Sequence, residues 1–413
     1  MLSSYHPSRR DMLHMTGVAA IGAVTLSPEH HIAAPPMNMH VTRVNPQDIG
    51  LDPKQLQVAY DLLEKWTTGR DPVVPGGAII VGRRGKVIAP KFFGKQGPEP
   101  DAVPIRDDGL FLMASVTKPI VYMAGMMLVE RGQLNLNDPV VRYVPAFRAH
   151  GKDRVLVSHL FTHASGLPDM LSNNAEMRKK HASLQTFLDA AAAETVPLFP
   201  PGTQLSYQSM GTAVVADIVQ RLSKVSIAEF LHREIFAPLG LKSTGLGSKG
   251  FDRERLVRVQ VPEYQAGTDF GWNSQYWQEL GAPWGGLFST PEDFAVLCQV
   301  MLSGGAWNGV RLLSPASVRM MTTNRLDDYA DLPESVRRTQ PWGLGWRLNH
   351  VGTPESWGDL LDRQVFGHTG ATGTTVWMDP KTDGFCILLT TAIRENAPWR
   401  LVHLSNAVAA AFV

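Results

Sequence analysis

Cysteine is scarce in this chain of 413 residues, which carries only Cys298 and Cys386. Each lies inside an apolar segment, and the sequence has no CxxC pair or cysteine–histidine cluster. We therefore expect two buried free thiols, with a disulfide as the alternative for an exported protein. We also expect no metal and no other cofactor, because no ligand cluster of the usual spacing is present.

An excess of charge of either sign is also missing. Lysine and arginine number 39, aspartate and glutamate 38, and the formal net charge is +1. We expect no nucleic-acid partner, because the chain has no strong positive field and no basic run interleaved with aromatic residues. No uncharged apolar run is long enough for a stable membrane span. With 44% hydrophobic and 19% charged residues, the chain can bury one large core or two medium ones.

The first 34 residues have the pattern of an export signal. Ser8-Arg9-Arg10-Asp11-Met12-Leu13 precedes an uncharged apolar stretch from Met15 to Leu26, which resembles a twin-arginine signal. Met12 and His14 depart from the usual form of the motif, and the cleavage signal is weak. We expect residues 1–34 to direct the protein to the periplasm or otherwise out of the cytoplasm. The alternative is a cytoplasmic protein with a disordered tail.

Strand signals lie toward the two ends of the chain, with helical signals between them. Ala78–Val81 with Lys86–Ile88, and Thr374–Met378 with Phe385–Thr390, each flank a glycine-containing turn and predict two hairpins. Trp342–Arg347 could add another strand. Because hairpins pair in antiparallel fashion and cannot bury their faces alone, we expect one antiparallel sheet built from both chain ends.

Helical spacing predicts the elements that cover this sheet and extend from it. Terminal helices should begin near Asp52-Pro53 and Pro398 and pack on the sheet. The intervening helical stretches are Ile120–Arg131, Leu184–Ala193, Thr212–Leu222, Ile227–Phe236 and Asp293–Leu302. We expect an α+β fold in which residues 45–413 form one two-lobed domain, with a mostly helical lobe inserted into the sheet and a cleft between them.

Ser115-Val116-Thr117-Lys118 sets a candidate nucleophile and a candidate base one helical turn apart. Residues three apart on a helix share a face, so the lysine amine can reach the serine hydroxyl and accept its proton. Such a spacing arises by chance about once in a chain of this length, and alone it does not identify an enzyme.

Two later segments could complete an acyl-transfer site. Tyr207 follows a Pro-Pro-Gly turn that would expose its hydroxyl as a proton relay. His368-Thr369-Gly370 precedes a strand and could line a groove for an extended substrate. The backbone amides of Ser115 and Ala371 are the candidate oxyanion donors.

In chain order these residues form three motifs, Ser115-x-x-Lys118, Tyr207-x-Ser209 and His368-Thr369-Gly370. The set resembles the penicillin-recognising serine hydrolases, most closely the branch of class C β-lactamases, related esterases and D-stereospecific peptidases. The resemblance covers roughly residues 45–410 and includes the segments 129–140, 160–168, 286–290 and 366–370. It implies that Ser115 is acylated, that Lys118 is its base and that Tyr207 relays the proton. A lysine base must be neutral, so we expect burial and neighbouring positive charge to lower its pKa.

Two positions depart from the family pattern. Ser209 stands where the family usually has asparagine, and His368 stands where it commonly has lysine. A histidine is mostly neutral at about pH 7, so the pull on a substrate carboxylate should be weaker. We therefore expect Ser209, His368, Thr369 and Gly370 to bind an ester or amide of modest size rather than a true β-lactam substrate.

The predicted function is that of a serine hydrolase that forms a covalent acyl-enzyme with a small-molecule or peptide acyl donor, as an esterase, D-stereospecific peptidase or β-lactamase-like enzyme. One alternative is a penicillin-binding or sensor protein that is acylated without turnover. A metallohydrolase could start from His159 and His163, but Leu160 stands where a zinc protease has glutamate. Oligomeric state stays open.

Substrate choice should depend on two loops, Asp169–Lys180 and Tyr264–Trp284. The aromatic residues that could wall the substrate pocket are Tyr264, Phe270, Trp272, Tyr276, Trp277 and Trp284.

Overall fold

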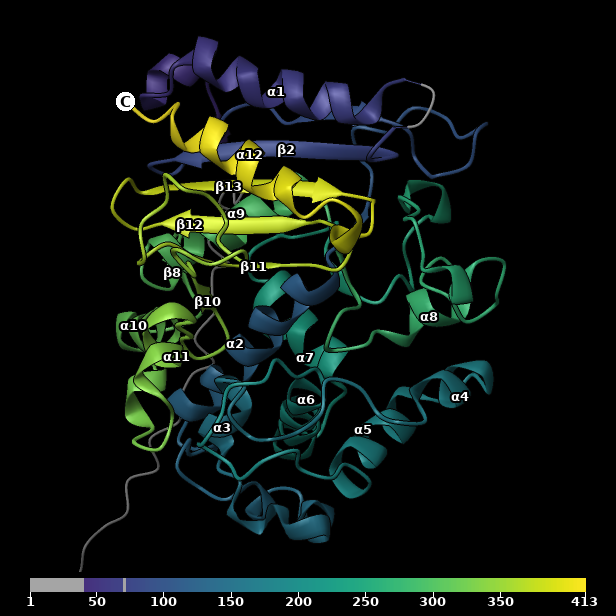
Figure 1. The fold of residues 1–413 in the computed structure, drawn as a ribbon, viewed down its shortest axis with the longest axis vertical. Helices are drawn as coiled ribbons and strands as arrows, with labels where there is room; N and C mark the ends of the chain where they lie inside the picture. The colour runs from purple at the N-terminus through teal and green to yellow at the C-terminus, as the bar shows by residue number, and fades with distance from the viewer. Residues whose placement is uncertain (1–40, 70–71) are drawn as a thin grey trace, which may run out of the picture. The chain divides into compact units, whose positions relative to one another are not determined.

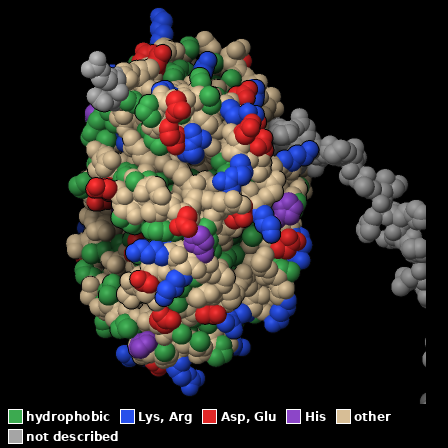
Figure 2. Space-filling model, turned by 90° about the vertical axis from the view of Figure 1, so that its right-hand side faces the viewer, with side chains coloured by type: hydrophobic (Ala, Val, Ile, Leu, Met, Phe, Trp, Pro, Cys, Tyr) green, Lys and Arg blue, Asp and Glu red, His purple; other side chains and the backbone are tan. Residues whose placement is uncertain are grey.

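The structure, a computed structural model, describes residues 41–69 and 72–413 (Figure 1). The proposed export signal, residues 1–34, lies outside the described residues. Within the described ranges, no helix is both long and apolar enough to cross a membrane. Figure 2 shows acidic and basic side chains interspersed over the face it presents, as the balanced charge leads one to expect.

The central sheet has eight strands in the order β1-β3-β2-β13-β12-β11-β10, with β4 also pairing with β2. They are β1 (Thr42–Arg43), β2 (Gly76–Arg83), β3 (Lys86–Val87), β4 (Lys91–Gly94), β10 (Arg347–Leu348), β11 (Phe366–Thr369), β12 (Thr375–Asp379) and β13 (Gly384–Thr390). Every neighbouring pair is antiparallel except β1 with β3.

Both predicted hairpins are confirmed, as β2–β3 and β12–β13. The two chain ends meet where β2 pairs with β13, from Thr390 opposite Gly77 to Gly384 opposite Arg83, and Figure 1 shows blue β2 beside yellow β13. The predicted antiparallel sheet built from both ends is therefore confirmed. The predicted strand at Trp342–Arg347 is wrong in extent, because only Arg347 and Leu348 form β10 and Trp342 contributes an isolated bridge.

The two faces of the sheet belong to different hydrophobic cores, because successive side chains of a strand point to opposite faces. Ile79 and Val81 of β2 face one core, which also holds Leu56 of α1 (Pro53–Thr67) and Leu404 of α12 (Trp399–Ala409). Ile80 faces the other core, which continues into the helical part of the chain. The terminal helices thus cover one face of the sheet, as predicted.

The helix α9 (Pro291–Leu302) lies elsewhere than predicted. We grouped it with the helical lobe, whereas it packs against β13 and β2, on the sheet face opposite α1 and α12. A helical hydrophobic pattern indicates a buried face but not which surface that face meets, so the sequence could not decide this. Thr290 caps the N-terminus of α9, since its hydroxyl accepts a hydrogen bond from the amide of Asp293 at 3.3 Å.

The helical lobe contains α2 to α7. Their bounds are α2 (Thr117–Glu130), α3 (Val157–Phe161), α4 (Asn174–Lys179), α5 (Leu184–Ala193), α6 (Met210–Ser223) and α7 (Ile227–Leu231). The remaining elements are β5 (Phe111–Leu112), β6 (Gly245–Leu246), β7 (Leu287–Ser289), β8 (Ala306–Trp307), β9 (Val310–Arg311), α8 (Gln275–Leu280), α10 (Pro315–Thr322) and α11 (Glu334–Thr339). Both Cys298 and Cys386 are buried free thiols, as predicted.

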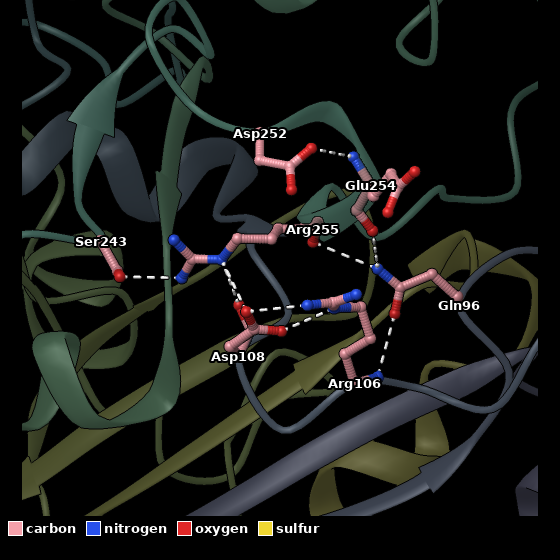
Figure 3. Close-up of polar contacts among 7 residues, drawn as sticks. All are labelled: Gln96, Arg106, Asp108, Ser243, Asp252, Glu254 and Arg255. Carbon is pink, nitrogen blue, oxygen red and sulfur yellow. Dashed lines mark hydrogen bonds and ion pairs between the residues drawn. The ribbon is translucent and has the colours of Figure 1, made fainter.

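A polar network fixes the segment that leads to Ser115 (Figure 3). Arg255 donates to the carbonyl of Asp108 at 3.0 Å and to Ser243 Oγ at 2.8 Å, and it pairs with the Asp108 carboxylate at 3.2 Å. Gln96 donates to the carbonyls of Glu254 and Arg255 at 3.2 and 3.1 Å. Residues around 108 and 255 are thereby held together just before β5.

Replacing Arg255 with alanine should lower the free energy of unfolding by about 1–2 kcal/mol, because three polar partners lose a charged donor. Urea denaturation measures the change. Arg106 is the matched control, since it pairs with the same Asp108 at 2.7 Å but is more exposed, and Arg106→Ala should leave the midpoint unchanged. Equal midpoints for the two variants would show that the network does not stabilise this segment.

Candidate active site

Ser115 lies in a tight 3-10 turn, Ala114–Val116, that leads directly into α2. Ala114 has a φ of 46°, a left-handed conformation that is unfavourable for a residue with a Cβ. The Thr117 hydroxyl holds the turn by donating to the Ala114 carbonyl at 2.6 Å and accepting from the Leu287 amide at 3.0 Å. Strained backbone of this kind is concentrated at functional sites.

Lys118 reaches Ser115 as its position one turn along the helix predicts. Its Nζ donates to Ser115 Oγ at 2.9 Å and to the Trp284 carbonyl at 2.8 Å. The side chain is buried, and this burial lowers the pKa of Lys118 to about 7. The expectation of neighbouring positive charge is wrong, because the charge that acts on Lys118 is the Asp169 carboxylate, which raises its pKa.

Tyr207 lies in the loop before α6 with its hydroxyl hydrogen-bonded to Ser115. Its ring lies 4.7 Å from Lys118 Nζ and 4.8 Å from the ring of His163. Desolvation raises the pKa of Tyr207 strongly, an effect opposed by the hydrogen bond to Ser115. Although 37% of the residue is exposed, the pKa of its hydroxyl is shifted upward. This shift keeps the phenol protonated at neutral pH.

The hydroxyl of Ser209 is engaged by Asp169. Its Oγ donates to Asp169 Oδ1 at 2.6 Å, and its amide donates to the Asp169 carbonyl at 3.2 Å. Sequence reasoning placed Ser209 in the site but did not single out Asp169, which follows directly on the family-like segment 160–168. Where the family usually has an asparagine side chain, this chain therefore has the hydroxyl group of Ser209, which orients the carboxylate of Asp169.

The third motif lies at the end of β11 against the turn that carries the nucleophile. A Cβ on Gly370 would lie 2.9 Å from both Ala114 Cβ and the Met113 carbonyl, so only glycine permits this approach. His368 is buried, and its Nδ1 lies 2.8 Å from the Thr369 carbonyl. Burial, and secondarily the charge of Lys118, hold its pKa well below the usual range. His368 is therefore neutral.

The amides of Ser115 and Ala371 are brought to the same place, because both residues line the two cavities at the site. Within the described part of the chain, neither amide donates to a protein acceptor. Two free N–H groups beside a nucleophilic hydroxyl are what an oxyanion requires.

Two cavities meet at Ser115. The first, of about 470 Å³, lies between the helical lobe and the sheet and includes Tyr207, His368 and Thr369 in its lining. Arg347 and Arg394 also line it, together with Glu355 and Glu395. Arg347 donates to the Glu355 carbonyl at 2.7 Å, and Arg394 pairs with the Glu395 carboxylate at 3.3 Å. Sequence reasoning missed the two arginines because they belong to none of the three motifs. Burial lowers the pKa of Arg347, but a guanidinium stays charged at neutral pH.

The second cavity, of about 220 Å³, is lined largely by apolar and aromatic side chains. Of the predicted wall residues, Tyr264, Trp272, Trp277 and Trp284 line it. Phe270 and Tyr276 do not; the Phe270 carbonyl accepts hydrogen bonds from Arg178, and Tyr276 stacks on His181. Both predicted specificity loops contribute to this cavity.

The two histidines of the metallohydrolase alternative have structural partners. His159 Nδ1 accepts from the Leu156 amide at 3.1 Å, and His163 Nδ1 accepts from the Gln208 amide at 3.2 Å. Burial lowers the pKa of His163 to about 3, so it packs against Tyr207 as a neutral ring. Among the residues the structure describes, no three histidine, cysteine or carboxylate side chains are grouped to hold a metal ion.

An antiparallel sheet flanked by helices and joined to a helical lobe is the architecture of β-lactamase- and transpeptidase-like hydrolases. The profile described as Beta-lactamase matches residues 64–410, and the chain belongs to the beta-lactamase family of hydrolases. The predicted family resemblance is thus confirmed.

Individual relatives are more distant. A protein of Salmonella schwarzengrund (strain CVM19633) with the provisional name D-alanyl-D-alanine carboxypeptidase is 27% identical over 374 residues, covering 82% of this chain and 83% of its own. A penicillin-binding protein homolog from Caulobacter crescentus has a TM-score of 0.69 at 22% identity, covering 88% of this chain and 99% of its own. The D-amino acid amidase from Ochrobactrum anthropi SV3 has a TM-score of 0.65 at 22% identity, covering 86% and 97%. These structures share the fold.

Proposed function

We propose that this protein is a serine hydrolase that acts on an ester or amide through a covalent acyl-enzyme at Ser115. The observation that carries the proposal is the 2.9 Å hydrogen bond from Lys118 to Ser115, made by a buried lysine whose pKa is lowered to about 7. At neutral pH about half of such lysines are neutral and able to accept the serine proton.

The proposed reaction begins as neutral Lys118 takes the proton of Ser115 and the Oγ attacks the acyl carbonyl. The amides of Ser115 and Ala371 stabilise the negative charge on the carbonyl oxygen. As the bond to the leaving group breaks, the Tyr207 hydroxyl gives its proton to that group and is reprotonated from Lys118. Attack by water on the ester of Ser115 then releases the acid and restores the free serine.

A peptidase is the favoured kind of amide hydrolase. Although His368 is neutral, the cations Arg347 and Arg394 line the first cavity. Arg394 donates to Thr369 Oγ1 at 3.4 Å and also pairs with Glu395 at 3.3 Å. A leaving group with a carboxylate would find its counter-charge there. The expectation that losing the motif lysine weakens the pull on a substrate carboxylate stays a prediction, which His368→Lys tests by comparing substrates with and without a carboxylate. The name of the Salmonella relative fits a carboxylate-bearing leaving group.

Side-by-side assays of an aryl ester, a chromogenic cephalosporin and a D-alanyl peptide test the proposal, with Ser115→Ala as the blank. We expect steady turnover of the ester or the peptide at many equivalents per enzyme. A burst of one equivalent followed by no turnover would instead favour the alternative, a penicillin-binding or sensor protein.

Replacing Tyr207 with phenylalanine should lower kcat about 100-fold, since it removes a proton relay but keeps the ring packed on His163. The loss should be larger for an amide than for an aryl ester, because an amine leaving group needs the proton more. Stopped-flow kinetics on both substrates measure this. An equal small loss on the two substrates would argue against the relay.

A further inference from the structure

Asp169 lies at the junction of the two cavities. Together with Ser115, Ser209 and Ala371, it lines both of them. Its side chain is exposed to the cavity rather than buried in the protein. A group carried by the carbon next to the reacting carbonyl would therefore lie near this carboxylate.

The carboxylate of Asp169 is held in place but only partly used. Ser209 donates to Oδ1 at 2.6 Å and, through its amide, to the Asp169 carbonyl at 3.2 Å. Among the described residues, no donor reaches Oδ2 and no lysine or arginine forms an ion pair with Asp169. The protein thus presents one fixed, negatively charged acceptor oxygen beside the nucleophile.

The cations nearby are directed elsewhere. Lys118 donates to Ser115 and to the Trp284 carbonyl. Arg178, the cation of the second cavity, donates to the Phe270 carbonyl at 2.6 Å and lies over the Trp277 ring at 5.9 Å. Neither side chain occupies the free oxygen of Asp169.

The second cavity indicates what should accompany a positively charged group. Its aromatic walls include Trp272, Trp277 and Trp284. A volume of about 220 Å³ exceeds the roughly 150 Å³ that suffices for a benzene ring. An apolar or aromatic side chain fits this space, with Asp169 at its mouth.

We propose that Asp169 binds the ammonium group of the acyl donor, so that the substrate is an α-amino ester or amide with an apolar side chain. The ammonium donates to Oδ2, the side chain enters the second cavity, and the leaving group lies in the first. This inference rests on acyl transfer at Ser115. Ser209 is a positioning residue that orients the carboxylate.

The test divides kcat/KM for phenylalanine p-nitrophenyl ester by kcat/KM for 3-phenylpropionyl p-nitrophenyl ester, which lacks only the amine. Both enantiomers of the amino ester are measured. The ratio of the two values is measured in wild type and in Asp169→Asn. The difference in intrinsic reactivity of the two esters is the same for both enzymes, and any effect of the substitution on Lys118 is shared by the two esters, so both cancel. We expect the ratio to fall about tenfold in Asp169→Asn, as for loss of one charge-assisted hydrogen bond. Glu176→Gln removes an exposed charge from the same loop and should leave the ratio unchanged.

An unchanged ratio in Asp169→Asn, or an equal fall in Glu176→Gln, would overturn the proposal. A second measurement covers the case in which neither ester is turned over well. 2-Phenylethylamine should slow acylation of wild type by p-nitrophenyl acetate but not that of Asp169→Asn, and equal protection of both would also overturn it. Retained turnover in Ser115→Ala would instead contradict the proposed function itself. Thermal unfolding of each variant confirms folding.

Discussion

Replacing Ser115 with alanine should lower kcat/KM for the accepted substrate by at least about 10⁴-fold, the range expected when the nucleophile of an acyl-transfer site is removed. The residue is only partly buried, and Lys118 keeps its hydrogen bond to the Trp284 carbonyl at 2.8 Å. The variant should therefore fold with a melting temperature within a few degrees of wild type.

Two controls separate loss of chemistry from loss of structure. Circular dichroism should give the same spectrum for both proteins, and equilibrium dialysis should show that Ser115→Ala still binds the substrate. Turnover at a tenth of the wild-type rate or more would mean that Ser115 is not the nucleophile.

The second large effect is expected at Lys118. Lys118→Met should lower kcat/KM by about 10³-fold, because a general base contributes about 10² to 10⁴ and methionine can fill the same buried space without accepting a proton. Methionine leaves the buried Trp284 carbonyl without its donor, so the free energy of unfolding should fall by about 1–3 kcal/mol, and thermal unfolding confirms that the variant folds.

The lowered pKa of Lys118 determines how kcat/KM should depend on pH. Burial lowers the pKa of Lys118 to about 7, so the inactive, protonated amine dominates below pH 7 and the neutral base above it. In wild type, kcat/KM should rise with pH to a plateau above about pH 7. A profile that is flat from acid to alkaline pH would contradict Lys118 as the base.

Lys152 supplies the matched control for Lys118. It is also buried, and its Nζ donates to the Ala192 and Thr195 carbonyls at 2.8 and 2.7 Å, but it lines neither cavity at Ser115. Lys152→Met should lower the free energy of unfolding by about 1–3 kcal/mol, because it leaves buried acceptors unpaired. Its pH profile should keep a midpoint near that of wild type, unlike that of Lys118→Met.

Local patterns account for the parts of the structure that could be predicted. Period-two strands beside glycine-containing turns predicted β2–β3 and β12–β13, because hairpin pairing depends on residues close in sequence. Likewise, the three-residue spacing of Ser115 and Lys118 predicted their contact, since a helix converts that spacing into proximity. The order of the three motifs in the sequence led to the family resemblance, which is confirmed.

The features that the sequence did not predict depend on tertiary packing. Nothing in the sequence of α9 distinguishes the sheet from the helical lobe as its partner. Arg347 and Arg394 reach the first cavity from separate elements, so no spacing connects them. The direction of the charge effect on Lys118 was also mistaken, because Asp169 and Lys118 are 51 positions apart and only the fold brings them together.

The central claim is that Ser115 becomes covalently acylated during turnover. Acid quenching during hydrolysis of an aryl ester, followed by intact-mass and peptide-mapping mass spectrometry, tests it directly. The account predicts one acyl group per chain, carried by the peptide that contains Ser115, and none in Ser115→Ala. Turnover without any adduct, or an adduct that persists in Ser115→Ala, would contradict it.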